Sequence, residues 1–318
     1  MNNKVSIGVL AFNEERHIEK VISELLIFDL PIYIIDDKST DNTLKIIEKF
    51  KNIEKIKIIK NNKNIGAGES TKILINSANE DGSKFLIKVD GDGQFLVSDI
   101  KRIIDIYNQD DYEFIKSNRF WDGGIKGDIP KVRFFGNLVA TLFMQISTGT
   151  NKLYDPLNGL FGISLSISNQ LNDKSFPKRY GYPYYLTLAA VINNFRTYQI
   201  NNVVKYDGQS SNLNSLKVFF TILKLSLIFY FRKLTIKKKV GIYQRSAFFD
   251  ILFLWFLLFT LICSSFLIYI PFYASTSLIS TVNLLIISIL LLFTSVLFFV
   301  LSFKEEKNIR KEYIDIDK

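Results

Sequence analysis

The feature that most constrains this chain is a long uncharged stretch near its C-terminal end. Between Ile251 and Phe303 there is no Asp, Glu, Lys or Arg, and "PFYASTS" (271–277) divides the stretch in two. A helix needs about 20 apolar residues to cross a hydrocarbon layer of about 30 Å. We therefore expect two transmembrane helices, 248–270 and 278–303, within a segment 247–303. The alternative, two very hydrophobic helices buried in a soluble protein, is disfavoured by the complete absence of charge.

The charges that flank this stretch predict its orientation. Eight basic residues and no acid lie between Lys217 and Arg245, four basic residues follow within 304–311, and the connecting loop has none. The positive-inside rule then places both ends of the hairpin, including a tail over 304–318, in the cytoplasm. Residues 208–318 hold 13 basic and 6 acidic side chains, which is seven of the net charge of +9. This location favours anionic lipid headgroups over nucleic acid as the partner.

A basic segment, 211–246, precedes the first predicted span. Its helical part, 211–234, is mostly apolar, with Lys217, Thr221 and Lys224 on one stripe. We expect an amphipathic helix at the membrane interface, with its lysines level with lipid phosphates. A buried core helix is the alternative.

Strand-like and helical patterns alternate in residues 1–210. Strands are expected at 4–10, 32–35, 53–61 and 84–90, with helices between them, the first over 13–26. The alternation predicts an α/β domain with a mostly parallel sheet, in which ligands bind beyond the carboxyl ends of the strands. Polar loops follow all four strands: "AFNEE", "DDKSTD", "NNKNIGAGES" and "DGDGQ". Each loop alone could be an ordinary turn with a helix cap, but four loops at one edge predict a binding crevice.

The fourth loop carries two closely spaced carboxylates, Asp90 and Asp92, separated and followed by glycine. Mg²⁺ and Mn²⁺ prefer oxygen ligands and commonly bind through one or two carboxylates together with substrate phosphates. The pair therefore predicts a metal–diphosphate site. The single cysteine, Cys263, lies inside a predicted span, and His17 is the single histidine, so a disulfide, a thiolate metal site, zinc chemistry and a Ser-His-Asp triad are disfavoured.

Taken in order, "LAFNEE" (10–15), "DDKSTD" (36–41), "NIGAGES" (64–70) and "DGDGQ" (90–94) resemble the family 2 glycosyltransferases of the GT-A fold. With two C-terminal spans, the chain looks most like the polyprenyl-phosphate branch related to dolichol-phosphate mannose synthase. The resemblance covers residues 4 to about 165 well and the remainder more loosely. It implies a GT-A domain over 1–210, a nucleotide-sugar donor and a Mg²⁺ or Mn²⁺ cofactor.

The resemblance also implies roles for individual residues. Asp90 and Asp92 would bind the metal, and Asp92, Arg119, Arg133 and Asp155 would form the catalytic set. Arg133 and Lys205 would meet the acceptor phosphate. The donor would contact the first loop, the second loop and the turns that follow the third and fourth strands: Leu10, Ala11, Phe12, Asn13, Glu14, Asp36, Asp37, Gly66, Asp90, Gly91 and Gln94.

The sequence departs from the family pattern in ways that bear on the acceptor. Leu10 replaces a usual proline, the "Gln-x-x-Arg-Trp" motif of processive synthases is absent, and "RYGYPYYLT" (179–187) lacks an acidic pair that hydroxyl-glycosylating relatives often carry. A sugar hydroxyl needs a general base, whereas a lipid phosphate is already anionic. The gap therefore favours polyprenyl phosphate as acceptor, although Asp155 could serve as a base.

Three hypotheses follow. The first is a membrane-anchored inverting glycosyltransferase that acts on polyprenyl phosphate. The second keeps the donor site but uses a hydroxyl of a lipid-linked saccharide in surface polysaccharide assembly. The third is a non-catalytic membrane protein that binds a nucleotide or a partner. The sugar and base stay open, as does the oligomeric state, because the apolar faces of the spans could meet lipid or another copy.

Overall fold

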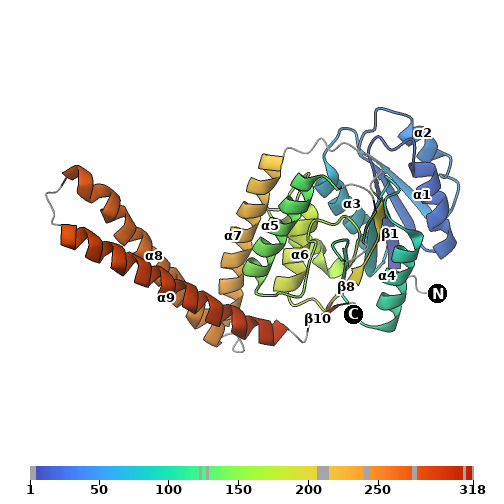
Figure 1. Ribbon diagram of the computed structural model, residues 1–318. Coiled ribbons are helices and arrows are strands. Elements are labelled where there is room, and N and C mark those ends of the chain that lie inside the picture. Colours follow the sequence, from blue (N-terminus) through green and yellow to red (C-terminus); the bar gives the residue numbers. More distant parts are fainter. Residues whose placement is uncertain are drawn as a thin grey trace. The chain divides into compact units, whose positions relative to one another are not determined.

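The computed structural model describes residues 5–121, 124–126, 129–205, 215–239, 244–273, 278–310 and 313–316 (Figure 1). The chain divides into two compact units. The first unit comprises Met1–Phe229 with Glu312–Lys318, and the second unit comprises Tyr230–Lys311. The boundary falls inside one helix, so the backbone passes from one unit to the other without a loop.

The first unit is built on an eight-stranded sheet in the order β10-β8-β5-β7-β4-β1-β2-β3. Only β7 runs antiparallel to its neighbours within this sheet, which confirms the predicted α/β architecture with a mostly parallel sheet. The strands are β1 (Val5–Ala11), β2 (Ile32–Asp36), β3 (Ile56–Lys60), β4 (Phe85–Asp90), β5 (Phe114–Asn118), β7 (Phe161–Ser164), β8 (Thr197–Asn201) and β10 (Ile314–Ile316). A separate parallel pair joins β6 (Ile125–Lys126) to β9 (Val204–Lys205).

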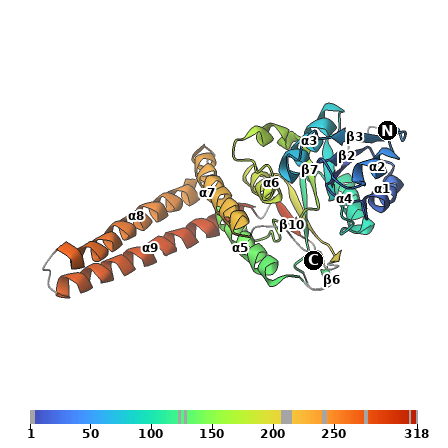
Figure 2. The ribbon, with the colours of Figure 1, turned by 90° about the horizontal axis from the view of Figure 1, so that it is seen from above.

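Helices cover both faces of this sheet (Figure 2). The helices of the first unit are α1 (Ile18–Leu25), α2 (Thr43–Glu48), α3 (Ala67–Glu80), α4 (Val97–Gln109), α5 (Lys131–Thr148) and α6 (Tyr182–Ile192), with 3-10 turns η1 (Leu26–Phe28) and η2 (Leu165–Asn172). The apolar positions of α1 and α4 share one core with alternate residues of β1, β2 and β4. On the other face, Leu74 of α3 approaches Leu86 across Gly8. Burial of both faces explains why these strands are continuously apolar.

The first helix begins later than the sequence predicts. We expected a helix over 13–26, but α1 begins at Ile18, because Asn13 has a φ of 57° and lies in the left-handed region. At the next helix, α2, the N-cap is Asn42, and the preceding Asp41 accepts at Oδ1 a bond of 2.9 Å from the backbone N–H of Thr43.

The described residues of the segment 304–318 belong to a helix and to the sheet. Helix α9 continues to Arg310, and β10 then pairs with β8 in parallel, with Ile314 opposite Thr197. Ile314 is buried and the hydroxyl of Tyr112 donates to Asp315 Oδ2 over 2.8 Å. Without β10, strand β8 would be an exposed edge of the sheet, and β10 pairs with this edge. The place of residues 314–316 therefore depends on the tertiary structure.

The second unit contains the end of α7 (Ser215–Lys239) and two long helices, α8 (Gln244–Tyr273) and α9 (Leu278–Arg310). Arg245–Leu267 and Thr281–Asn308 are long and apolar enough to cross a membrane. The helices pack through aromatic rings, with centroids 5.4 Å apart for Phe253–Phe299 and 5.3 Å for Phe256–Phe298. Most of their remaining apolar side chains are exposed, as expected for helices that face lipid.

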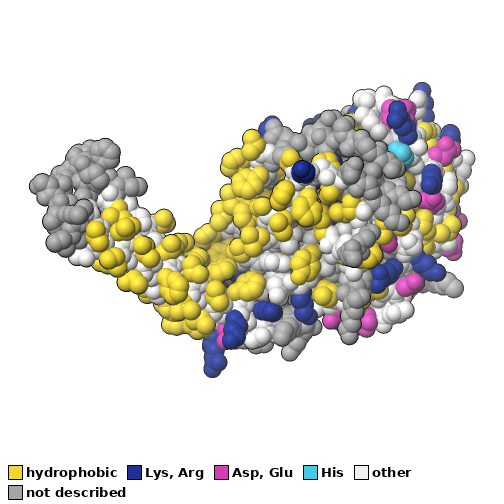
Figure 3. Space-filling view, in the orientation of Figure 1, with side chains coloured by type: hydrophobic (Ala, Val, Ile, Leu, Met, Phe, Trp, Pro, Cys, Tyr) yellow, Lys and Arg dark blue, Asp and Glu magenta, His cyan; other side chains and the backbone are white. Residues whose placement is uncertain are grey.

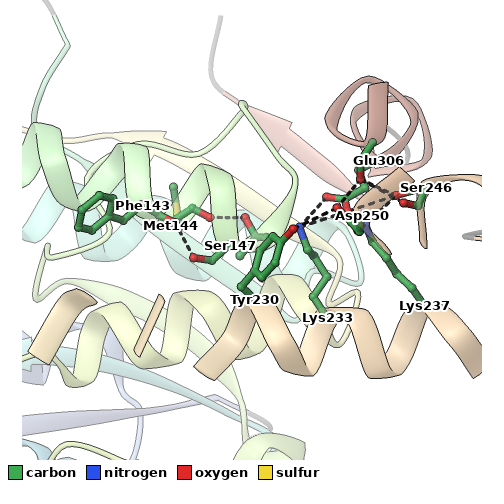
Figure 4. A network of polar contacts seen from close by, with 11 residues as sticks. Phe143, Met144, Ser147, Tyr230, Lys233, Lys237, Ser246, Asp250 and Glu306 are labelled. Atoms are coloured by element: carbon green, nitrogen blue, oxygen red, sulfur yellow. Dashed lines mark hydrogen bonds and ion pairs between the residues drawn. The ribbon is translucent and has the colours of Figure 1, made fainter. Parts of the chain in front are cut away.

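A buried polar cluster joins the three helices of the second unit (Figure 4). Lys233 and Lys237 of α7 pair with Glu306 of α9, and Lys237 also pairs with Asp250 of α8. None of these four side chains is more than 3% exposed. Two positive and two negative charges balance, and Ser246 accepts a further bond of 2.6 Å from Lys237. Such mutual compensation allows ionised groups to lie at the ends of apolar helices.

Removal of one cation from this cluster should destabilise the second unit. Lys237→Met leaves Asp250 and Glu306 with a single lysine, so we expect a loss of about 3–5 kcal/mol, the range for a buried charge that loses its partner. Denaturant unfolding of the full chain in detergent micelles, followed by the fluorescence of Trp255 in α8, measures the change. Lys224→Met removes an exposed lysine of the same helix and serves as the control. Equal stability of the two variants would contradict the role of the cluster.

Candidate functional site

The carboxyl ends of β1, β2 and β4 bring three of the predicted loops together. Ala11 at the end of β1 pairs in register with Asp36, and Leu10 pairs with Asp90. Two backbone bonds of 2.9 Å, Asp37 N to Ala11 O and Gly91 N to Leu10 O, carry the contact past the strand ends. The acidic loops after β2 and β4 therefore flank the loop after β1.

The first and second loops are joined by hydrogen bonds of their side chains. Asn13 Oδ1 accepts from the N–H of Thr40 over 2.8 Å, and the N–H of Glu14 donates to Thr43 Oγ1 over 2.7 Å. Asp36 accepts from the N–H of Ser39 at 3.2 Å. In this structure Asn13 and Asp36 therefore shape the two loops.

Asp37 performs a similar task for the third loop. Its carboxylate accepts from Asn61 Nδ2 at 2.8 Å, from the N–H of Ile65 at 2.9 Å and from the N–H of Gly66 at 2.8 Å. Gly66 has a φ of 97°, and a Cβ there would lie 2.7 Å from Lys178 O. Glycine is needed because the loop turns sharply into α3 against the segment before α6.

Three carboxylates in this crevice repel one another. Burial and the charge of Asp90 raise the pKa of Asp92 to about 6. Burial and the charges of Asp92, Asp90 and Asp41 raise the pKa of Glu14 to about 7. Oxygen ligands of this kind fit Mg²⁺ or Mn²⁺, which would relieve the repulsion. No group of three acidic, His or Cys side chains forms a complete metal site among the described residues, so phosphate oxygens would complete the coordination.

The raised pKa values predict a pH dependence of stability in the metal-free protein. Between about pH 4 and pH 7 the folded state binds more protons at Glu14 and Asp92 than the unfolded state, so stability should fall as the pH rises through this window. Thermal unfolding of the full chain in micelles from pH 4 to 8 measures the slope. Mn²⁺ with UDP should flatten it. An unchanged slope with the metal, or a rise in stability over this window, would contradict the carboxylate cluster.

Lys88 is a site residue that the sequence analysis missed. It lies two residues before Asp90 on the same face of β4, is fully buried, and pairs with Asp90 Oδ1. Its Nζ lies 5.4 Å from the ring centroid of Tyr182, and a Cβ at Gly159 would collide with Asp90 Oδ2. Burial alone would lower the pKa of Lys88, but Asp90 and Tyr182 raise it overall, so the lysine stays charged. Lys88 therefore fixes Asp90 and offsets its charge.

Loss of Lys88 should lower the stability of the fold around Asp90. We expect Lys88→Met to lower the free energy of unfolding by about 1–3 kcal/mol, because Asp90 loses a buried partner. Mn²⁺ with UDP should restore part of the loss, since the metal would replace the lysine as counter-charge. Denaturant titration with and without both ligands measures this. The control is Lys84→Met, an exposed lysine just before the same strand. A variant as stable as this control would refute the role of Lys88.

A second group of charges surrounds Asp155. This aspartate has a φ of 51° and is fully buried. Arg119 Nε lies 3.0 Å from its Oδ2, Arg119 Nη2 donates to Oδ1 over 3.1 Å, and Asn158 Nδ2 donates to Oδ2 over 3.1 Å. The carboxylate is thus occupied by protein donors, and it holds Arg119 at the end of β5.

Lys116 is the second buried lysine that the sequence analysis missed. It lies on β5, three residues before Arg119, and donates to the backbone oxygen of Asn158. Burial lowers its pKa to about 7, against the opposing attraction of Asp155. The available signal was a lysine that follows the apolar start of each of two strands, "FLIKVD" and "FIKSN".

The remaining predicted residues are placed less centrally. Arg133 lies half-buried in the first turn of α5, where the neighbouring Phe134 contacts Phe120 with ring centroids 5.7 Å apart. Phe12 is 43% exposed, and Gln94 donates its N–H to Asp92 Oδ1 over 3.0 Å. Lys205 ends β9, and its side chain lies outside the described residues.

Comparison with known proteins identifies the family. The model of glycosyl transferase family 2 matches residues 6–171, which include all four loops and both groups of charges up to Asn158. The chain belongs to this family. A family 2 member is a glycosyltransferase, so the crevice at the carboxyl edge of the sheet is the candidate active site.

Two relatives and one solved structure illustrate the likeness. A UDP-N-acetylglucosamine–dolichyl-phosphate N-acetylglucosaminyltransferase of Methanococcus voltae is 29% identical over 184 residues, 54% of this chain and 73% of the relative. The poly(ribitol-phosphate) beta-N-acetylglucosaminyltransferase TarS of Staphylococcus aureus is 28% identical over 116 residues, 34% of this chain and 20% of the relative. Glucosyl-3-phosphoglycerate synthase of Mycobacterium tuberculosis, in complex with Mn²⁺, UDP and phosphoglyceric acid, shares the fold at a TM-score of 0.53 and 17% identity, covering 70% of this chain and 78% of that chain.

Proposed function

We propose that this chain is a membrane-anchored inverting glycosyltransferase that moves a sugar from a nucleotide-diphosphate sugar to polyprenyl phosphate. The observation that carries the proposal is the group of repelling carboxylates, Glu14, Asp90 and Asp92, at the carboxyl edge of the sheet of a family 2 chain. Lys88 offsets the charge of Asp90, and a divalent cation would offset the remaining negative charge, with the donor diphosphate supplying further oxygen ligands.

Each group of charges then has a task. Asp90 and Asp92 would hold Mg²⁺ or Mn²⁺, with Asp90 fixed by Lys88. The metal would supply charge neutralisation for the departing nucleoside diphosphate. Glu14 and the loops shaped by Asn13, Asp36 and Asp37 would form the nucleoside side of the crevice. The M. tuberculosis neighbour that binds Mn²⁺ and UDP on the same fold is consistent with this donor class.

The environment of Asp155 supports a phosphate acceptor. Its carboxylate is buried and bonded to Arg119 and Asn158, so it is poorly placed to remove a proton from a hydroxyl. A phosphate acceptor is already a nucleophile and needs a cation to position it, and Arg119 is a side chain held for that purpose. The M. voltae relative, named for dolichyl phosphate, agrees with this choice.

An exposed apolar face on the first unit supports contact with the bilayer. Figure 3 shows hydrophobic side chains gathered over α5 and α7. Phe135 and Leu138 of α5 are 60% and 57% exposed, and Leu216 and Phe220 of α7 are 71% and 63% exposed. The other side of α7 packs on α6, where Tyr185 and Phe229 have ring centroids 5.0 Å apart. Lys217 and Lys224 would then meet anionic headgroups.

The chain path supports a cytoplasmic site. The start of α7 and the strand β10 both belong to the first unit, so the chain enters the second unit from the first and afterwards returns to it. The basic residues that flank both helices favour the cytoplasm for that side.

A second acceptor remains a candidate because of one relative. TarS of S. aureus is named for transfer to poly(ribitol-phosphate). A hydroxyl on a lipid-linked saccharide would require a base other than the paired Asp155.

Two assays test the proposal. Asp92→Asn should reduce transfer by about 100-fold or more, because the metal loses a carboxylate ligand, while Asp105→Asn, at an exposed acid of α4, should leave it unchanged. Purified full-length protein with Mn²⁺ is offered labelled UDP-, GDP- and dTDP-sugars with polyprenyl phosphate or with a lipid-linked saccharide. If product forms only with the lipid-linked saccharide, the acceptor is that saccharide and not polyprenyl phosphate. Full activity of Asp92→Asn would refute the metal site.

A further inference from the structure

The strand that follows the second membrane-length helix is part of the sheet that carries the site. Within the described residues, α9 ends at Arg310 and β10 begins at Ile314. Ile314 is buried and pairs with Thr197, and Ile316 pairs with Gln199. The backbone N–H of Thr197 also donates to Tyr313 O over 2.8 Å. The exit segment of the hairpin is thereby fixed to β8.

The edge strand β10 and its neighbour β8 hold the loop that leads to Asp155. Lys152 Nζ donates to the backbone oxygen of Ile314 in β10. The N–H of Tyr154 donates over 2.7 Å to the side-chain oxygen of Gln199, which is buried in β8 opposite Ile316. Lys152 therefore attaches the loop to β10, and Tyr154 attaches it to β8, just before Asp155.

The conformation of Asp155 requires such support. A non-glycine residue with a φ of 51° is held in a sparsely populated region, and this persists only where neighbouring contacts over-determine it. On one side Asp155 is held by Arg119 and Asn158, and on the other side the chain is held through Tyr154 and Lys152. Release of the second side would let Asp155 relax and Arg119 move with it.

We propose that β10 is a positioning element of the active site: through Lys152 and Gln199 it holds the loop 150–155, and so orients the Asp155–Arg119 pair toward the acceptor. The catalytic part of this inference rests on the proposed function. The segment that returns from the membrane hairpin would then contribute to turnover as well as to anchoring.

The physical test compares two isoleucines of the same short strand. Ile314→Asp places a charge at a buried position and should detach β10, whereas Ile316→Asp changes a side chain that is 41% exposed. Hydrogen exchange of the full chain in micelles should rise about tenfold or more at the amides within 154–158, which are those of all its residues except Pro156, in Ile314→Asp only. The amide of Tyr154 is the direct reporter, since its acceptor lies in β8. Unchanged exchange at 154–158 in a variant whose β10 amides exchange freely would overturn the proposal.

If Ile314→Asp fails to fold, two milder variants of Lys152 still test the proposal. Lys152→Met removes the donor to β10, and Lys152→Arg keeps one. Lys152→Met should raise exchange at 154–158 and Lys152→Arg should not. If Lys152 contributed only to overall stability, Lys152→Met would lower the melting temperature without a selective rise in exchange at these amides.

Kinetics test the catalytic consequence. Ile314→Asp and Lys152→Met should lower kcat about tenfold or more while KM for the nucleotide-sugar stays near the wild-type value, because the donor crevice is formed by other strands. Lys152→Arg and Ile316→Asp should retain kcat. Wild-type kcat in a variant with raised exchange at 154–158 would show that the loop does not orient Arg119 for turnover. If the wild-type protein transfers no sugar, the proposed function fails, and the exchange data still decide whether β10 holds the loop.

Discussion

Mutual repulsion of carboxylates at the end of parallel strands is the constraint on which the site depends. Asp90 and Asp92 are brought beside Glu14 because β4 and β1 are hydrogen-bonded neighbours that end at the same edge. Burial makes this repulsion costly, as the raised pKa values of Glu14 and Asp92 show. Carboxyl groups with raised pKa values that gather at one edge of a sheet are typical of functional sites, which agrees with the place of the candidate active site.

The protein limits this cost with buried lysines rather than with solvent. Lys88 lies directly beneath Asp90 and is held charged by it, while Lys116 lies near the Asp155 group. Both lysines are fully buried in strands, but only Lys88 forms an ion pair, whereas Lys116 donates to a backbone oxygen and burial lowers its pKa to about 7. The buried cluster of α7, α8 and α9 follows the same rule, with Lys233 and Lys237 opposite Asp250 and Glu306. At Lys88 and in the helix cluster, the buried ionised groups each have an opposite charge within bonding distance.

The structure shows which of the predicted site residues also hold the loops in place. Asn13 and Asp37, which were expected to contact the donor, bond to neighbouring loops, and Asp36 bonds to Ser39 within its own loop. Asp155 was considered as a base, yet its oxygens are occupied by Arg119 and Asn158. These polar side chains hold the loops together, and they thereby determine where Glu14, Asp90, Asp92 and Arg119 lie.

The sequence by itself determined the sheet class, the positions of the polar loops, the acidic pair and the two apolar helices. These features are local: periodicity sets strands and helices, and loops that follow parallel strands must meet at one edge. Only the tertiary structure decided the pairing of Lys88 with Asp90, the saturation of Asp155 and the return of residues 314–316 to the sheet. Each of these joins residues through a side-chain contact or a sheet edge whose partner is chosen by packing. A single sequence gives the hydrogen-bonding capacity of a lysine or an edge strand, but the identity of its partner depends on which surfaces the fold brings together.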